Sequence, residues 1–202
     1  MFSKITKPFA YLLLGLSVMT FTACDDDDDF PEEENDLEVI TRVTLSFTND
    51  QDAGDVVTAL AVDPDGAGIQ DLEVLENIVL KANTTYTLEM ELLNELDPND
   101  VKDITAEVKD EDDEHQFFFA FTEGVFTTPT GNGNVDGEGE VNYLDQDGNG
   151  NPVGLETSWT AATATTGTFR VILKHQPGLK TATSTVNEGG TDIDVTFDIT
   201  VE

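Results

Sequence analysis

Apolar and polar residues alternate along several segments of this chain. Val43, Leu45 and Phe47 are each flanked by polar residues, and the segment 85–92 repeats this pattern more regularly. Successive side chains of a strand point to opposite faces of a sheet, so this alternation predicts strands with one buried face. The predicted strands cover 42–48, 56–62, 85–92, 168–174 and 193–201, with shorter candidates at 77–81, 116–122, 140–144 and 155–162.

Turn-forming residues separate these segments, as in the stretch Asp63-Pro64-Asp65-Gly66. Many short strands joined by Gly, Asn and Asp turns favour a mainly β fold. We expect an antiparallel β-sandwich of the immunoglobulin-like type found in extracellular lipoprotein domains, or a barrel. A single β-rich domain is expected over 38–202.

One segment departs from the strand pattern. Asp97 and Pro98 suit the start of a helix, and acids follow over the first turn. Val101, Ile104 and Val108 then recur at helical spacing on one face. The sequence therefore predicts one short helix near 98–114.

The aromatic run in 116–122 admits two interpretations. Neighbouring side chains of a strand face opposite ways, so one set could line a ligand pocket on a second surface. A strand buried on both faces explains the run more simply. The phenylalanines concerned are Phe117, Phe118, Phe119, Phe121 and, beyond the run, Phe126.

The first 23 residues are typical of a secretory signal. Lys4 and Lys7 precede an apolar run over 9–21, which is too short to span a membrane, and small residues lead to Cys24. The stretch ending at Cys24 resembles the lipobox of bacterial lipoproteins. That resemblance implies cleavage before Cys24 and a lipid, such as palmitate, on its thiol.

An acidic segment follows the cysteine over 24–37. Asp25 to Asp29 and Glu32 to Glu34 resemble the surface-export signal of Bacteroidetes-type lipoproteins, which implies an outer-membrane lipoprotein displayed at the cell surface. A block of like charges is also typical of a solvated tether, and the periplasmic face is the alternative location.

The net charge and the cysteine content limit the partners and the chemistry that this protein can have. The chain has 42 acidic and 9 basic residues; without Lys4 and Lys7 the net charge is 7 − 42 = −35. Such a surface repels nucleic acid and favours cations or basic partners. Cys24 is the only cysteine, so its acylation leaves neither a disulfide nor a thiolate ligand.

Residues 145–156 match the twelve-residue calcium loop as a string. Oxygen-bearing residues stand at positions 1, 3 and 5, glycine at 6 and glutamate at 12. The flanks read as strands, so a polar hairpin loop is the alternative. The candidate calcium ligands are Asp145, Asp147, Asn149, Asn151 and Glu156.

The chain has two histidines. His115 continues the apolar stripe of the predicted helix, with Glu111 four residues before it, and His175 follows Leu173 at strand spacing. If the histidines meet, with Glu111 or Glu114, they would form a nitrogen–oxygen site for zinc or copper, or hold haem iron from both faces. The alternative is two unrelated histidines at strand ends.

Hydrolytic chemistry finds little support. After the signal, the serines are Ser46, Ser158 and Ser184, and none lies in a nucleophile elbow. With 42 acids, a carboxylate pair for glycoside hydrolysis cannot be singled out. We expect a protein that is not an enzyme.

Several segments resemble a family of Bacteroidetes-type lipoproteins often labelled type 1 periplasmic binding fold proteins. The resemblance is carried by 86–95, 103–118, 173–175, 190–195 and the stretch Asn149-Gly150-Asn151-Pro152-Val153-Gly154-Leu155-Glu156. It implies a TonB-dependent receptor as partner, while the label implies two α/β lobes. We expect a surface lipoprotein that captures a metal or haem for a TonB-dependent importer; the rival is a structural or adhesive module stabilised by calcium.

Overall fold

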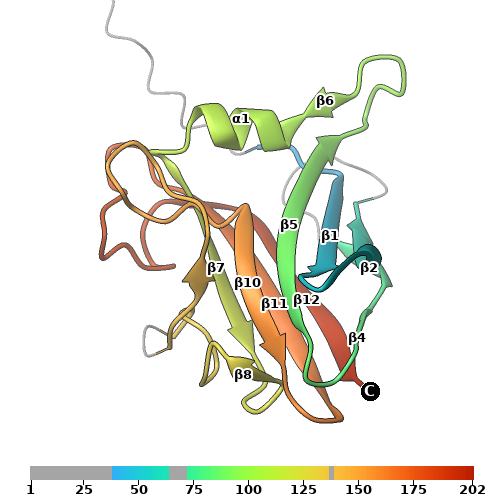
Figure 1. The fold of residues 1–202 in the computed structure, drawn as a ribbon. Coiled ribbons are helices and arrows are strands. Elements are labelled where there is room, and N and C mark those ends of the chain that lie inside the picture. Colours follow the sequence, from blue (N-terminus) through green and yellow to red (C-terminus); the bar gives the residue numbers. More distant parts are fainter. Residues whose placement is uncertain (1–37, 64–71, 137–138) are drawn as a thin grey trace, which may run out of the picture. The chain divides into compact units, whose positions relative to one another are not determined.

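The computed structural model describes residues 38–63, 72–136 and 139–202. Within them the chain forms two β-sheets whose inner faces pack on each other, with one short helix across one end (Figure 1). The mainly β class expected from the alternating pattern is confirmed, and the arrangement is that of a sandwich or barrel. The signal segment, Cys24 and the acidic tether lie outside the described residues.

The larger sheet has the strand order β3-β2-β1-β5-β10-β8, with β6 beside β5 and β9 beside β10. Every pairing in it is antiparallel. Its strands are β1 (Arg42–Asn49), β2 (Asp52–Val62), β3 (Glu73–Glu76), β5 (Thr85–Asn94), β6 (Lys102–Asp103), β8 (Phe126–Thr128), β9 (Asn142–Tyr143) and β10 (Glu156–Ala161).

The smaller sheet has the order β4-β12-β11-β7. Its strands are β4 (Ile78–Leu80), β7 (His115–Phe121), β11 (Thr165–His175) and β12 (Gly190–Val201). β12 pairs in parallel with β4, whereas the other pairings are antiparallel. The pair of β4 with β12 is the one departure from the antiparallel arrangement among the described strands, because β4 joins its sheet beside a strand far along the chain.

An aromatic cluster joins the two sheets. Trp159 of β10 is fully buried and lies 5.0 Å from Phe169 of β11 between ring centroids, in an edge-to-face arrangement. Phe119 and Phe121 of β7 lie 5.4 and 5.5 Å from the same indole. Because large rings bury the most apolar surface, this cluster anchors the core.

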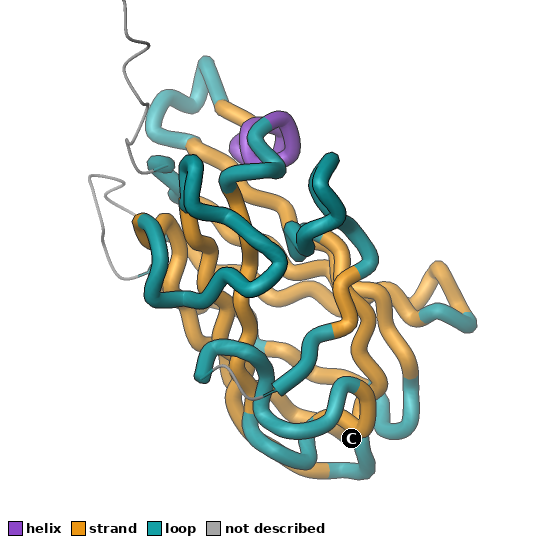
Figure 2. Tube along the Cα trace, turned by 90° about the vertical axis from the view of Figure 1, so that its left-hand side faces the viewer, coloured by secondary structure: helices purple, strands orange, loops and turns teal. Residues whose placement is uncertain are grey.

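β7 is buried on both faces, as the simpler interpretation of the phenylalanine run predicted. Phe117, Phe119 and Phe121 belong to the core between the sheets, whereas Phe118 is 1% exposed on the opposite face. The outer edge of β7 is occupied by loop residues: Phe119 N–H donates to the Asn134 side chain and Phe121 N–H to the Asn132 carbonyl. Figure 2 faces the side of the unit on which Figure 1 labels β7, and it shows loops lying in front of the strands there.

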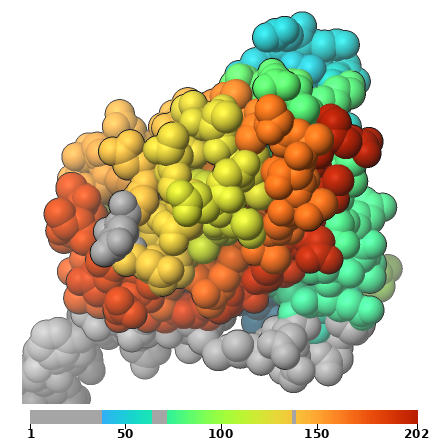
Figure 3. All heavy atoms as spheres, turned by 90° about the horizontal axis from the view of Figure 1, so that it is seen from below, coloured from blue at the N-terminus to red at the C-terminus, as the bar shows by residue number. Residues whose placement is uncertain are grey.

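The end of the unit remote from the helix is closed by strand ends and turns. Figure 3 views this end, where atoms of β8, the β10–β11 turn and the end of β12 lie together. The functional candidates lie at the other end, beside the helix.

The helix α1 (Ile104–Asp110) is shorter than predicted. Asp97 does not cap it: Asp97 accepts from the Asn99 N–H within a turn. The chain then stays extended because Lys102 and Asp103 pair with β5, so Asp103 becomes the N-cap and accepts from the Ala106 N–H.

The buried face of α1 agrees in part with the predicted stripe. Ile104 and Val108 are buried, whereas Val101 is 47% exposed because it precedes the helix. The Thr105 hydroxyl accepts from the Leu92 N–H and thereby fixes α1 to β5. Among the described residues, no helix is long and apolar enough to cross a membrane.

Candidate metal centre

The two histidines lie side by side at the end of the smaller sheet that α1 covers. His115 of β7 is the register partner of His175 of β11. Both share the core-facing side of their strands with Phe117 and Leu173, because residues two apart point to the same face. The imidazole rings stack with centroids 4.5 Å apart and planes within 3°, and the residues are 0% and 3% exposed.

Two glutamates from the turn after α1 reach this pair. His115 Nδ1 lies 3.2 Å from the Glu111 carbonyl oxygen and 3.9 Å from Glu111 Oε2. His175 Nε2 lies 3.3 Å from Glu114 Oε2. One ligand atom each from Glu111, His115 and His175 lie within 4.8 Å of one another. The residues predicted as one possible site are therefore brought together.

A third carboxylate approaches from β12. Leu173 faces Ile193 and Lys174 faces Thr191, so Asp192 is the extra residue of a β-bulge. Its Oδ1 accepts from the Glu38 N–H at 3.2 Å, and its Oδ2 lies 3.9 Å from His115 Nε2. The Asp192 side chain is fully buried.

Burial dominates the electrostatics of this cluster. Desolvation lowers the pKa of His115 to about 4, so its ring is neutral at pH 7 and available as a ligand. Desolvation raises the pKa of Asp192 to about 6. It also raises the pKa of Glu38 to about 7, with Glu107 the next cause. The crowded carboxylates favour any cation that enters.

Several polar atoms here are buried without a hydrogen-bond partner. They include His115 Nε2, His175 Nδ1 and Asp192 Oδ2. Buried polar groups are normally paired, so a concentration of unpaired ones calls for an explanation by an ion, water or function.

The donor set fits a transition metal. Imidazole nitrogen with carboxylate oxygen suits zinc or copper. Two such bonds of about 2.0–2.2 Å place the ligand atoms about 3.3–4.1 Å apart, depending on the angle at the metal. The 3.9 Å between His115 Nδ1 and Glu111 Oε2 lies in that range and exceeds a hydrogen bond. Because the rings are parallel, their in-plane nitrogen lone pairs do not converge on one point, so at least one ring must rotate for both to bind one ion.

Haem does not fit this geometry. Two axial histidines must point their nitrogens at the iron from opposite faces of the porphyrin. The rings of His115 and His175 instead lie flat against each other at 4.5 Å, which leaves no room for a macrocycle between them.

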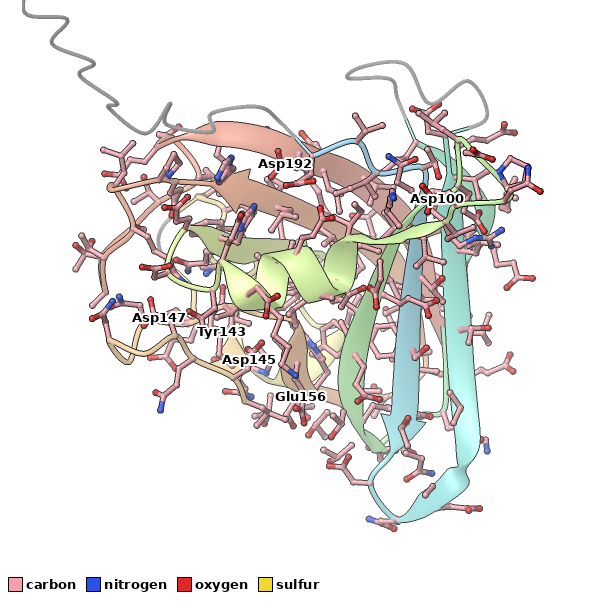
Figure 4. All side chains as sticks on the ribbon, turned by 90° about the horizontal axis from the view of Figure 1, so that it is seen from above. Asp100, Tyr143, Asp145, Asp147, Glu156 and Asp192 are labelled. Carbon is pink, nitrogen blue, oxygen red and sulfur yellow. The ribbon has the colours of Figure 1, made fainter. Side chains whose placement is uncertain are left out.

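The acidic loop predicted for calcium lies on the other side of α1 from Asp192 (Figure 4). The carboxylate of Asp145 accepts from the N–H groups of Gly154, Leu155 and Glu156. That of Asp147 accepts from the N–H groups of Asn149 and Asn151. These backbone bonds stabilise the tight turns that Asp and Gly favour.

Asp147 also has a cationic partner. Lys180 Nζ lies 3.4 Å from Asp147 Oδ2, and both side chains are fully buried. Lys180 donates as well to the Asp112 carbonyl, next to the turn that carries Glu111. Hydrogen bonds from Asn149 and Asn151 help to lower the pKa of Asp147 against the opposing effect of burial.

The remaining calcium candidates occupy separate places. The Asn151 amide donates to Asp147 Oδ2 rather than offering its own oxygen, and the exposed Glu156 lies in β10. Calcium at this loop stays a prediction from the sequence. In this conformation the ion would have to displace both Lys180 and backbone N–H groups.

Sequence reasoning missed Asp192. Its position carries no special pattern, since Asp192 simply precedes the alternating strand 193–201. Only the bulge, which depends on pairing with β11, turns its side chain toward His115. No family model, curated protein or solved structure was found to match this chain.

Proposed function

We propose that this protein binds a transition metal ion, zinc or copper, at Glu111, His115 and His175, with Glu114 assisting. The observation that carries the proposal is the meeting of the chain's two histidines, stacked and buried, with a glutamate oxygen in reach of the same point. If His115 and His175 had no shared role, nothing would favour their lying directly opposite each other on β7 and β11.

The wider charge pattern supports capture of a cation. The formal net charge is −33, and four further carboxylates, of Glu38, Glu107, Glu114 and Asp192, surround the ligand group. A negative field raises the local concentration of cations. The imidazoles of His115 and His175 then supply the selective bonds.

The segment before the domain supports a proposal for the biological setting. We propose a surface-anchored lipoprotein, acylated at Cys24, that holds the ion without chemical turnover and passes it to a TonB-dependent importer. The lipobox-like stretch ending at Cys24 and the acidic tether support this location.

The test is a calorimetric titration of the metal-free protein with Zn²⁺ and Cu²⁺. We expect one ion per chain, and at least about a 100-fold loss of affinity in His115→Ala and in His175→Ala, because each removes one of three ligands. Asp194→Asn serves as the control, since it removes an acid of an exposed pair with Arg170. Equal binding by wild type and both histidine variants would refute the site.

A further inference from the structure

The two ring nitrogens of His115 face different surroundings. Nδ1 points to the Glu111 carbonyl oxygen at 3.2 Å, whereas Nε2 points to Asp192 Oδ2 at 3.9 Å. A carbonyl oxygen only accepts, so the metal-free ring carries its proton on Nδ1. Nε2 is then a bare acceptor facing another acceptor, which explains why both atoms are unpaired.

Metal binding must change this arrangement. Glu111 lies on the Nδ1 side, so an ion shared by Glu111 and His115 binds Nδ1 and displaces the proton there. A neutral imidazole bound through one nitrogen carries its proton on the other. The proton is therefore on Nε2 in the metal-bound protein, and Nε2 becomes a donor.

We infer that Asp192 is a positioning residue for this metal site: its Oδ2 accepts the hydrogen bond from Nε2–H of His115 once Nδ1 has bound the ion. The inference rests on the proposed function. Asp192 is not itself a ligand here, because among the described residues the group of ligand atoms within mutual reach contains Glu111, His115 and His175. A histidine held in this way by a carboxylate is fixed in orientation and is more basic as a ligand.

The position of Asp192 suits this role. The bulge in β12 turns the side chain inward, and the bond from the Glu38 N–H to Oδ1 fixes the carboxylate while leaving Oδ2 for the ring. A shortening of about 1 Å, by a small movement of the ring, converts the 3.9 Å separation into a hydrogen bond.

The melting temperature of the metal-free protein distinguishes a positioning role of Asp192 from a purely structural role. In the metal-free protein one oxygen of this buried carboxylate has no partner, which is unfavourable. Removing the carboxylate should therefore leave the melting temperature of the metal-free protein unchanged or higher, while it weakens metal binding. A structural acid would instead lower the melting temperature on removal.

The experiment compares wild type with Asp192→Asn and Asp192→Ala, using Zn²⁺ alone as the probe. Asp194→Asn is the matched control, because it makes the same charge change two residues along β12 in an exposed pair with Arg170. We expect about 10- to 100-fold weaker zinc binding for Asp192→Ala, a smaller loss for Asp192→Asn, and none for the control. The metal-free melting temperatures should not fall.

Nitrogen-15 spectra of the histidine rings provide the second readout. Zinc-loaded wild type should show His115 bound through Nδ1, with an Nε2–H that exchanges slowly with water; in Asp192→Ala this proton should exchange faster. Binding through Nε2, or unchanged affinity in Asp192→Ala, would overturn the inference while leaving the metal site intact. If wild type binds no zinc, the proposed function itself fails.

Discussion

Two acidic clusters lie beside α1, the loop around Asp147 and the group around His115, and their buried charged groups differ in how many partners they have. In the loop around Asp147, the carboxylates accept several backbone N–H groups and meet Lys180. Around His115, by contrast, the Asp192 carboxylate and both rings keep buried atoms without partners. In sequence, the loop resembled a metal site more closely than the histidines did. In the structure, however, it is the histidine end that has buried polar atoms without hydrogen-bond partners.

This difference shows what a pattern of oxygen ligands can and cannot establish. Asp and Asn at alternate positions suit calcium, but the same residues stabilise turns by accepting from their own backbone. The histidine end differs, because polar atoms of His115, His175 and Asp192 there are buried without a hydrogen-bond partner. On this comparison, the loop has a structural role and the histidine end a functional one.

The largest effect is expected from Lys180→Met. Removing the ammonium leaves Asp147 buried with an uncompensated charge, so we expect a loss of about 3–5 kcal/mol of unfolding free energy. Arg170→Met is the control: its pair with Asp194 is about 40% exposed (41% and 44%) and should cost about 1 kcal/mol or less. Urea denaturation measures both, and equal small losses would contradict a structural role for the loop.

The second prediction concerns pH in the metal-free protein. The folded His115 has a pKa of about 4 against an ordinary 6.5, so only the unfolded chain gains its proton as pH falls between these values. This lowers stability by up to about 3 kcal/mol by pH 4. Glu38 and Asp192 act in the opposite sense, since their raised pKa values make the folded state the better proton binder.

Single variants separate the two effects. Relative to wild type, His115→Asn should gain stability as pH falls from 6.5 to 4, whereas Glu38→Gln should lose stability between pH 7 and 4.5. Taking differences from wild type removes the background of the other acids. Parallel pH profiles for all three proteins would show that these groups do not titrate as the geometry requires.

A smaller effect is expected from Asp103→Ala. This change removes the N-cap bond to the Ala106 N–H and should cost about 1 kcal/mol. Because α1 leads directly to Glu111, zinc affinity should also fall a few-fold. Asp100→Ala is the control, since Asp100 pairs with Lys102 at the exposed surface. If zinc affinity is equal in both variants, α1 does not hold the ligand in place.

The smallest effect is expected from calcium. A loop with a dissociation constant of about 0.5 mM would add about 1.4 kcal/mol at about 5 mM calcium. Because Lys180 and backbone N–H groups already engage Asp145 and Asp147, we expect no change in melting temperature. A clear rise in wild type would reverse the comparison and restore the calcium interpretation of residues 145–156.

The sequence predicted those features that depend on local pattern. Strands β1, β5, β11 and β12 follow from alternation, since each has one face in the core. The short strands β3, β6 and β8 were missed, because two to four residues give too few alternations to register. The α1 start was misplaced because pairing of β6 with β5 outweighed a good local cap at Asp97.

The candidate site was only partly readable for the same reason. The ligand types were evident from two histidines and a glutamate four residues before one of them. Their meeting depends on the register of β7 with β11, a contact between segments that are distant in sequence. The inward orientation of the Asp192 side chain depends in addition on the bulge in β12, which no local sequence pattern predicts.

The placement of β12 also governs the order in which the domain assembles. β12 lies between β4 and β11, and the Asp198 N–H donates to the Asn77 side chain across 121 residues. A nascent chain that has not yet released residues 190–201 has β4 and β11 without their common neighbour, so the smaller sheet cannot close. Such distant pairing makes folding slow. The end of the smaller sheet that holds His115 and His175, and that Asp192 of β12 approaches, therefore forms only after residues 190–201 have been synthesised.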